Sequence, residues 1–156
     1  STRQIAKEAK VSDGFLYNYF KSKENLAIAV LESAFKTLDA AIKVETGDDA
    51  AQNLTQAITG FIDLLETATD KIRLIVQMSI HKDEFTFLKE INARKHEQSI
   101  AIFEQYFKQL NYENSNEEAR LLVTLLDGFV LEALLMDNHV NLEDRKAYLI
   151  QKYTQA

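Results

Sequence analysis

The absence of proline is the feature that most constrains how this chain can fold. Proline breaks helices, yet none occurs among the 156 residues, which also include only four glycines. Long, uninterrupted helices are therefore favoured. No stretch alternates apolar and polar residues as a half-buried strand does, and no internal repeat is visible. The sequence predicts an all-α protein.

The first 26 residues predict two short helices joined by a tight turn, then a basic loop that leads into a third helix. Ser12 can cap the second helix, and Leu16 and Phe20 can pack back onto the first. The buried side of the first helix and the turn are expected to be formed by Ile5, Ala6, Ala9 and Val11. This is the pattern of a helix-turn-helix, whose second helix lies in the DNA major groove.

The segment from Ile5 to Leu26 closely resembles the DNA-binding signature of the TetR (tetracycline repressor) family of bacterial regulators. It reads Ile-Ala-x-x-Ala-x-Val-Ser-x-Gly-x-Leu-Tyr-x-Tyr-Phe-x-x-Lys-x-x-Leu. The resemblance implies an all-helical homodimer, with a helix-turn-helix DNA-binding head and a linking helix over residues 1–44. The larger domain over residues 45–156 would bind an effector and dimerise. The printed sequence opens at the second helix of such a head, so the head is expected to be incomplete at its N-terminus.

Lys10 departs from the signature, because many family members have glycine at this place in the turn. The position often needs a positive φ, which lysine adopts at a cost of about 1 kcal/mol.

Charge is distributed unevenly. The net charge of −6 combines +2 over residues 1–43 with −8 over the remainder. A mildly basic head on an acidic body keeps the attraction for phosphates local. The chain has no cysteine, which fits a reducing, cytoplasmic setting. No apolar run approaches the length of about 20 residues that spans a bilayer, so no membrane partner is expected.

Within the second helix, outward-facing side chains near its start can read bases. Asn18 can pair with adenine, Asp13 can accept from a cytosine amine and Phe15 can pack on thymine methyls. By resemblance, Thr2, Arg3, Tyr17, Tyr19 and Lys23 hold phosphates. Two alternatives stay open: Asp13 only complements the positive helix end, and Tyr17 only packs. The residues expected at double-stranded DNA are thus Thr2, Arg3, Asp13, Gly14, Phe15, Tyr17, Asn18, Tyr19 and Lys23.

The rest of the chain predicts further helices near residues 23–44, 50–69, 70–80, 85–110, 117–136 and 142–153. The stretch from Leu121 to Met136 is apolar nearly all the way round, so it should be covered on two sides. By resemblance, one side meets a second copy, and the homodimer forms through the last two helices. The alternative is a central buried helix in a monomer.

Family resemblance also implies an effector cavity among the middle helices. The residues expected near it are Phe61, Leu65, Met78, His81, Phe87, Phe103, Tyr106 and Phe129. Aromatic rings and methionine suit a small, largely apolar effector of unknown identity. Each residue can equally be ordinary core.

An enzyme is the weaker reading. None of the three histidines, His81, His96 and His139, lies in a His-Glu-x-x-His motif, and a metal site of His81, Asp83 and His96 lacks support. No cofactor and no metal are expected. We therefore expect a DNA-binding transcriptional regulator, a repressor released from a palindromic operator by its effector. The alternative is a dimeric small-molecule-binding protein of the same fold with a reduced DNA-binding role.

Overall fold

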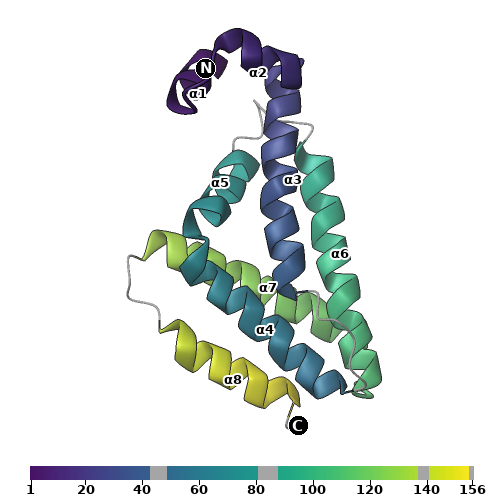
Figure 1. Cartoon of the computed structure of the whole chain (residues 1–156). Helices are drawn as coiled ribbons and strands as arrows, with labels where there is room; N and C mark the ends of the chain where they lie inside the picture. Colours follow the sequence, from purple (N-terminus) through teal and green to yellow (C-terminus); the bar gives the residue numbers. More distant parts are fainter. Residues whose placement is uncertain (43–48, 81–87, 137–140, 155–156) are drawn as a thin grey trace.

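The computed structural model describes residues 1–42, 49–80, 88–136 and 141–154. All secondary structure in these ranges is helical, which confirms the all-α prediction (Figure 1). The helices are α1 (Thr2–Glu8), α2 (Asp13–Tyr19), α3 (Lys23–Ile42), α4 (Ala50–Thr67), α5 (Thr69–Ile80), α6 (Leu88–Gln109), α7 (Ser115–Leu135) and α8 (Leu142–Thr154).

Helix ends follow the capping residues in the sequence. The Ser12 hydroxyl accepts from the backbone N–H of Phe15 at 3.1 Å, which confirms it as the cap of α2. Ser22 caps α3 in the same way, and Asp49 caps α4 by accepting from two backbone N–H groups. The predicted end of the third helix near residue 44 and the predicted helix start near residue 85 lie outside the described residues.

The head is small, and its core is smaller than the sequence predicted. Ala6, Leu16 and Leu26 form its buried centre, with Val11, Phe20 and Val30 packed around them. The prediction that Ile5 and Ala9 are buried was wrong: Ile5 is 46% exposed and Ala9 is exposed. Only the side of the short α1 that carries Ala6 faces α2 and α3, so the residues on the other sides of α1 point to solvent.

Lys10 does adopt the predicted left-handed conformation, with φ of 56°. Two hydrogen bonds close the turn around it: the Lys10 N–H donates to the Lys7 carbonyl and the Val11 N–H donates to the Ala6 carbonyl. This is the Schellman pattern that ends many helices. The backbone bonds and the packing of Val11 therefore hold lysine where glycine is usual.

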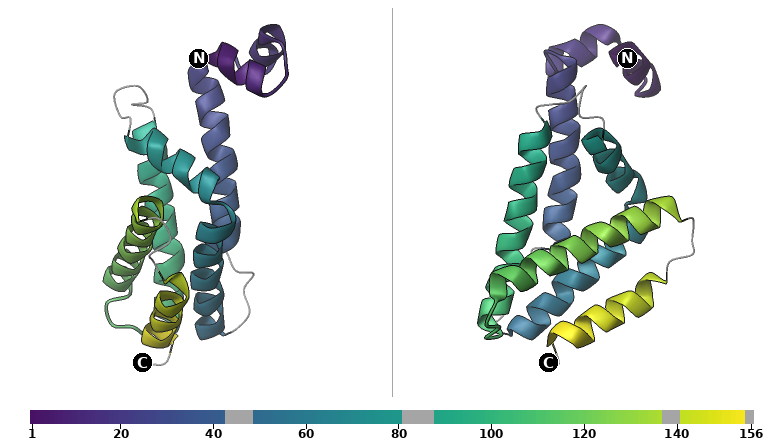
Figure 2. Two further views of the ribbon diagram at one scale, coloured as in Figure 1. Left: turned by 90° about the vertical axis from the view of Figure 1, so that its left-hand side faces the viewer. Right: turned by 180° about the vertical axis from the view of Figure 1, so that it is seen from behind.

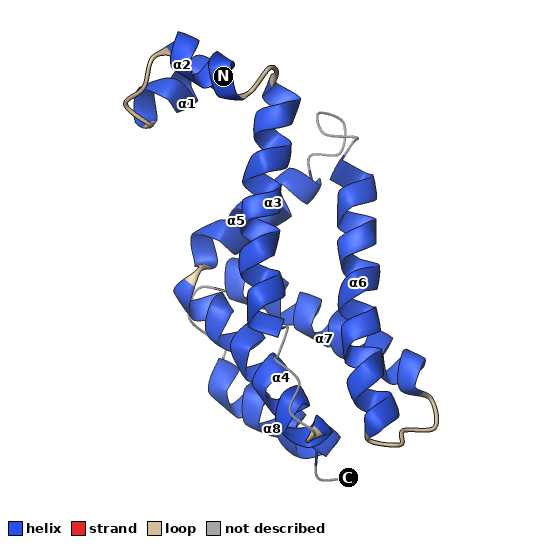
Figure 3. Cartoon of the chain, turned by 45° about the vertical axis from the view of Figure 1, so that its right-hand side comes forward, coloured by secondary structure: helices blue, strands red, loops and turns tan. Residues whose placement is uncertain are grey.

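A long helix links the head to the body. α3 leaves the head and runs down beside α6, with α5 on its other flank, while α4, α7 and α8 cross the lower part obliquely (Figures 1 and 2). The main core lies among these helices and includes Leu54, Ile58, Ile62, Phe107 and Leu122. Figure 3 shows the head standing apart from this body at the far end of α3.

α3 and α4 approach each other very closely at Gly60. A Cβ atom at this position would clash with the backbone carbonyl oxygen of Ala41. Two backbones can meet here only because residue 60 has no side chain.

α7 buries one side and exposes the other in the single chain. Ala119, Leu122, Val123, Leu126 and Phe129 are buried. Three leucines on the remaining surface are 41–76% exposed, namely Leu121, Leu125 and Leu135. Within the described residues of one chain, the helix is thus covered on one side, and the second cover expected from the sequence is not part of this chain's own fold.

Candidate functional site

The outer face of α2 presents the side chains that the sequence assigned to DNA. Phe15 and Tyr19 are 50% and 67% exposed, and their rings contact each other in a tilted arrangement with centroids 4.9 Å apart. Asn18 is exposed beside them, and a Cβ at Gly14 would meet no atom within 4 Å. Lys23 is exposed at the first turn of α3. The face is therefore open to a large partner.

Four of the assigned residues are paired with one another across the two helices. The Thr2 and Tyr17 hydroxyls lie 3.1 Å apart, and Arg3 Nε donates to Asp13 Oδ2 at 3.1 Å. These contacts join the start of α1 to the outer face of α2. The Arg3 side chain is 87% exposed, so this ion pair adds little stability but does orient the guanidinium.

A cavity of about 770 Å³ lies in the body beside α3. Volumes of 300–1,000 Å³ are usual for sites that enclose a small molecule. Most of its wall is apolar and is drawn from α3, α4, α5, α6 and α7. The lining residues are Phe35, Leu38, Asp39, Ile42, Phe61, Ile75, Val76, Ser79, Ile80, Asn92, Lys95, His96, Ser99, Phe103, Val123, Leu126, Asp127, Val130 and Leu131.

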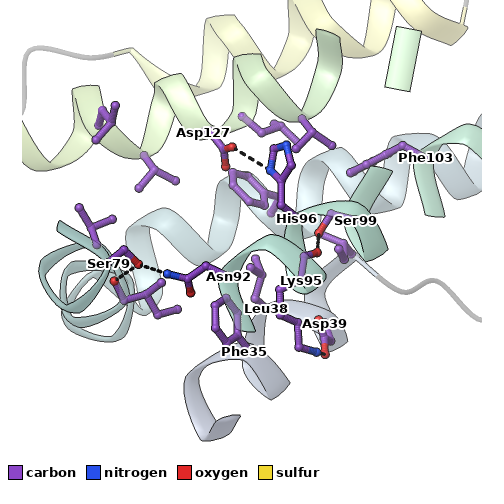
Figure 4. A pocket seen from close by; sticks show the side chains of 18 of the residues that line it. Phe35, Leu38, Asp39, Ser79, Asn92, Lys95, His96, Ser99, Phe103 and Asp127 are labelled. Carbon is purple, nitrogen blue, oxygen red and sulfur yellow. Dashed lines mark hydrogen bonds and ion pairs between the residues drawn. The ribbon is translucent and has the colours of Figure 1, made fainter. Parts of the chain in front are cut away.

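The polar part of the wall belongs mainly to one face of α6. Asn92, Lys95, His96 and Ser99 follow the helical i, i+3, i+4, i+7 spacing and all line the cavity (Figure 4). Three of them reach three different neighbouring helices. Asn92 Nδ2 donates to Ser79 Oγ of α5 at 2.8 Å, Lys95 Nζ lies 2.5 Å from Asp39 of α3, and His96 Nδ1 lies 3.5 Å from Asp127 of α7.

Asp127 is the one cavity-lining residue among those described whose protonation is clearly perturbed. Burial raises the pKa of its carboxyl above the ordinary value, and the nearby His96 offsets part of this effect. The Asp127 side chain is nevertheless 60% exposed to water. A carboxyl that water reaches, yet that protein atoms surround, faces a hollow rather than open solvent.

Comparison with known proteins connects this geometry to a family. Residues 1–30 match the family model described as bacterial regulatory proteins, tetR family. The chain is 25% identical to the HTH-type transcriptional regulator BetI of Stenotrophomonas maltophilia, over 89% of this chain and 73% of that protein. It is 26% identical to the protein of that name from Yersinia pestis, over 92% of this chain and 75% of the relative.

Residues 1–30 thus match the TetR family. Over most of its length the chain is similar to transcriptional regulators of the helix-turn-helix type, and TetR-family regulators bind DNA. A solved transcriptional regulator from Rhodococcus sp. Rha1 shares the fold, with a TM-score of 0.78, 20% identity, and coverage of 99% of this chain and 85% of that one. None of the described helices is both long and apolar enough to cross a lipid bilayer.

The residues that the sequence assigned to an effector are distributed over several places in the body. Phe61 and Phe103 line the cavity. Leu65, Tyr106 and Phe129 are buried in the main core, and Met78 packs on the separate cluster of Leu31, Phe35 and Leu88. His81 and Phe87 lie outside the described residues.

Several cavity residues were missed by the sequence reasoning. Phe35, Leu38 and Asp39 of α3 were treated as part of a linking helix only, because their position in the wall depends on how α3 crosses α6. The polar residues of α6 did carry a signal. Four polar side chains at the spacing of one helix face, Asn92 to Ser99, mark a polar stripe that could have been recognised as the side of a site.

Proposed function

We propose that this TetR-family protein is a homodimeric repressor that leaves a palindromic operator when a small, largely apolar effector fills the cavity in its body. The head and linking helix over residues 1–44 would bind DNA, and residues 45–156 would bind the effector and dimerise. The DNA-contacting residues proposed are the nine assigned from the sequence, with Asp13 acting partly through Arg3.

The observation that carries the proposal is that one helix contributes both to the core of the head and to the wall of the cavity. The first turns of α3 complete the head core through Leu26 and Val30. Further along the same helix, Phe35, Leu38 and Ile42 wall the cavity. Because a helix is stiff over this length, a change in the cavity that tilts α3 also moves the head.

The exposed leucines of α7 support the dimer part of the proposal. Leu121, Leu125 and Leu135 recur along one side of α7 together with Gly128, at which a Cβ would meet no atom within 4 Å. Tyr148 on α8 is 66% exposed as well. Large apolar side chains gathered on one surface favour burial against a second copy, and glycine permits close approach of helices. The two-fold symmetry of such a dimer would place its two heads to bind DNA half-sites about 34 Å apart.

Random-site selection followed by fluorescence anisotropy, titrated across salt concentrations, tests the proposal. We expect a palindromic sequence to be enriched and to be bound with an affinity that falls steeply as salt rises. Weak binding that is blind to sequence would instead support the alternative of a small-molecule-binding protein with a reduced DNA role.

A further inference from the structure

The polar groups around the cavity differ in how many hydrogen bonds they can still form with a ligand. Asn92, Lys95, His96 and Ser99 line one wall, and Asp39 and Asp127 face it from α3 and α7 (Figure 4). Protein partners use part of each group's hydrogen-bonding capacity. What remains decides which chemical groups a ligand must bring.

The donors of this wall are mostly directed at protein atoms. Asn92 Nδ2 donates to Ser79 Oγ, and the Ser99 hydroxyl donates to the carbonyl of Lys95 at 3.2 Å. Lys95 is the single lysine or arginine among the described residues that line the cavity, and Asp39 lies 2.5 Å from its ammonium. Its charge is thus already matched.

The acceptors, in contrast, remain available. Asn92 Oδ1 is buried and has no hydrogen-bond partner among the described residues. The His96 ring nitrogen that faces Asp127 is Nδ1, at 3.5 Å, which leaves Nε2 as the nitrogen that can meet a ligand. An unpartnered buried acceptor is costly, and a donor supplied by a ligand would remove that cost.

Asp127 is the strongest of these acceptors. The charged or polar group that faces it is the His96 ring, whose Nδ1 lies 3.5 Å from Asp127 Oδ2, and no lysine or arginine of the described residues pairs with this carboxylate. Its raised pKa and its accessibility to water both fit a carboxylate that faces the hollow with its charge incompletely balanced.

We propose that the effector is an apolar, ring-bearing molecule with hydrogen-bond donors along one edge, supplied by an amine or a hydroxyl, and that Asp127 accepts from this edge. The rings of Phe35, Phe61 and Phe103 provide the surface for the apolar body. A ligand carboxylate is disfavoured because it would meet Asp127 without an unmatched cation to hold it. This inference rests on the proposed function, in which the cavity takes the effector.

Calorimetric titration of the whole chain with three probes that share one ring system tests the inference. The probes are 2-(1-naphthyl)ethylamine, 2-(1-naphthyl)ethanol and 1-naphthylacetic acid. We expect the amine and the alcohol to bind and the acid to bind at least about tenfold more weakly, the difference that one charge-assisted hydrogen bond makes.

Two variants then assign the effect to Asp127. Asp127→Asn keeps the shape and one acceptor but removes the charge, so it should weaken the amine about tenfold and change the alcohol much less. Asp63→Asn is the matched control, because Asp63 pairs with Lys146 and does not line the cavity. It should leave both affinities unchanged. Thermal melting of each variant checks that it folds.

If the acid binds as tightly as the amine, or if Asp127→Asn leaves the amine affinity unchanged, the donor-edge inference is overturned while the cavity stands as a ligand site. If none of the probes binds, the inference is overturned too. The DNA-binding part of the proposed function is decided separately by the anisotropy experiment, so the two failures are distinguishable.

Discussion

At Gly60, one absent methyl group sets the distance between two helices. The nearest atom to a Cβ built there is a backbone oxygen, Ala41 O, which cannot rotate away as a side chain can. Gly60→Ala should therefore lower the free energy of unfolding by about 1–3 kcal/mol, although alanine favours helix more than glycine does. Urea denaturation followed by circular dichroism measures this.

Gly14→Ala is the matched control, because open space surrounds that position. It should leave the fold stable. Equal stability of the Gly60 and Gly14 variants would contradict the close approach of α3 and α4.

The surroundings of Asp127 lead to a prediction about how folding stability depends on pH. Because its pKa is raised above the ordinary value of 3.8, the folded chain binds this proton more readily than the unfolded chain does. The resulting stability is fully present below pH 3.8 and is lost as the pH rises through the folded-state pKa. Asp127→Asn cannot titrate, so its stability relative to the parent should be greater at pH 7 than at pH 4.

Denaturant unfolding of both proteins at the two pH values checks this sign. Since the side chain is 60% exposed, we expect a small difference. A variant that gains on the parent as the pH falls would show that the carboxyl is stabilised, not penalised, by its surroundings.

At the scale of whole helices, sequence patterns predicted most of what the structure contains. The capping residue Ser12 marked a helix start, since a cap acts through hydrogen bonds to residues two or three positions away. The left-handed turn at Lys10 was equally local. The burial of side chains in α1 could not be predicted locally, because whether Ile5 is covered depends on elements far away in the sequence.

The cavity shows the same limit more strongly. Its wall combines residues from five helices, and a core phenylalanine differs from a cavity phenylalanine only in whether neighbours fill the space in front of it. Phe103 and Phe129 both belong to the main core, yet Phe103 lines the cavity and Phe129 on the next helix does not. Residue type and spacing carry no information about that difference.

The exposed leucines of α7 give a prediction about assembly. Leu125→Glu places a charge at the centre of the proposed dimer surface, where burial without a partner is costly. The variant should be monomeric at micromolar concentration in multi-angle light scattering. Glu143→Gln, on the solvent face of α8, should not alter the mass. A parent chain that is itself monomeric would refute the dimer.

For the whole molecule, we expect substitutions in the head to affect DNA binding in two different ways. Lys23→Ala should weaken binding to all DNA sequences alike and reduce the slope of log affinity against log salt by about 1, as loss of a phosphate contact does. Asn18→Ala should instead change preference at one base position, with a cost of about 1–3 kcal/mol there. Anisotropy on a set of single-base operator variants separates the two patterns. A Lys23 variant with unaltered affinity and slope would exclude its phosphate role.

The sharing of α3 between head and cavity also limits how such a regulator can evolve. A mutation at Phe35, Leu38 or Ile42 that adapts the cavity to a new molecule also alters the helix that carries the head. Mutations at cavity positions on the other helices, such as Phe61, Val76 or Val123, are free of that second effect. Changes of ligand specificity should therefore accumulate first on α4, α5 and α7. Selections for unregulated gene expression should recover α3 substitutions alongside those in α2.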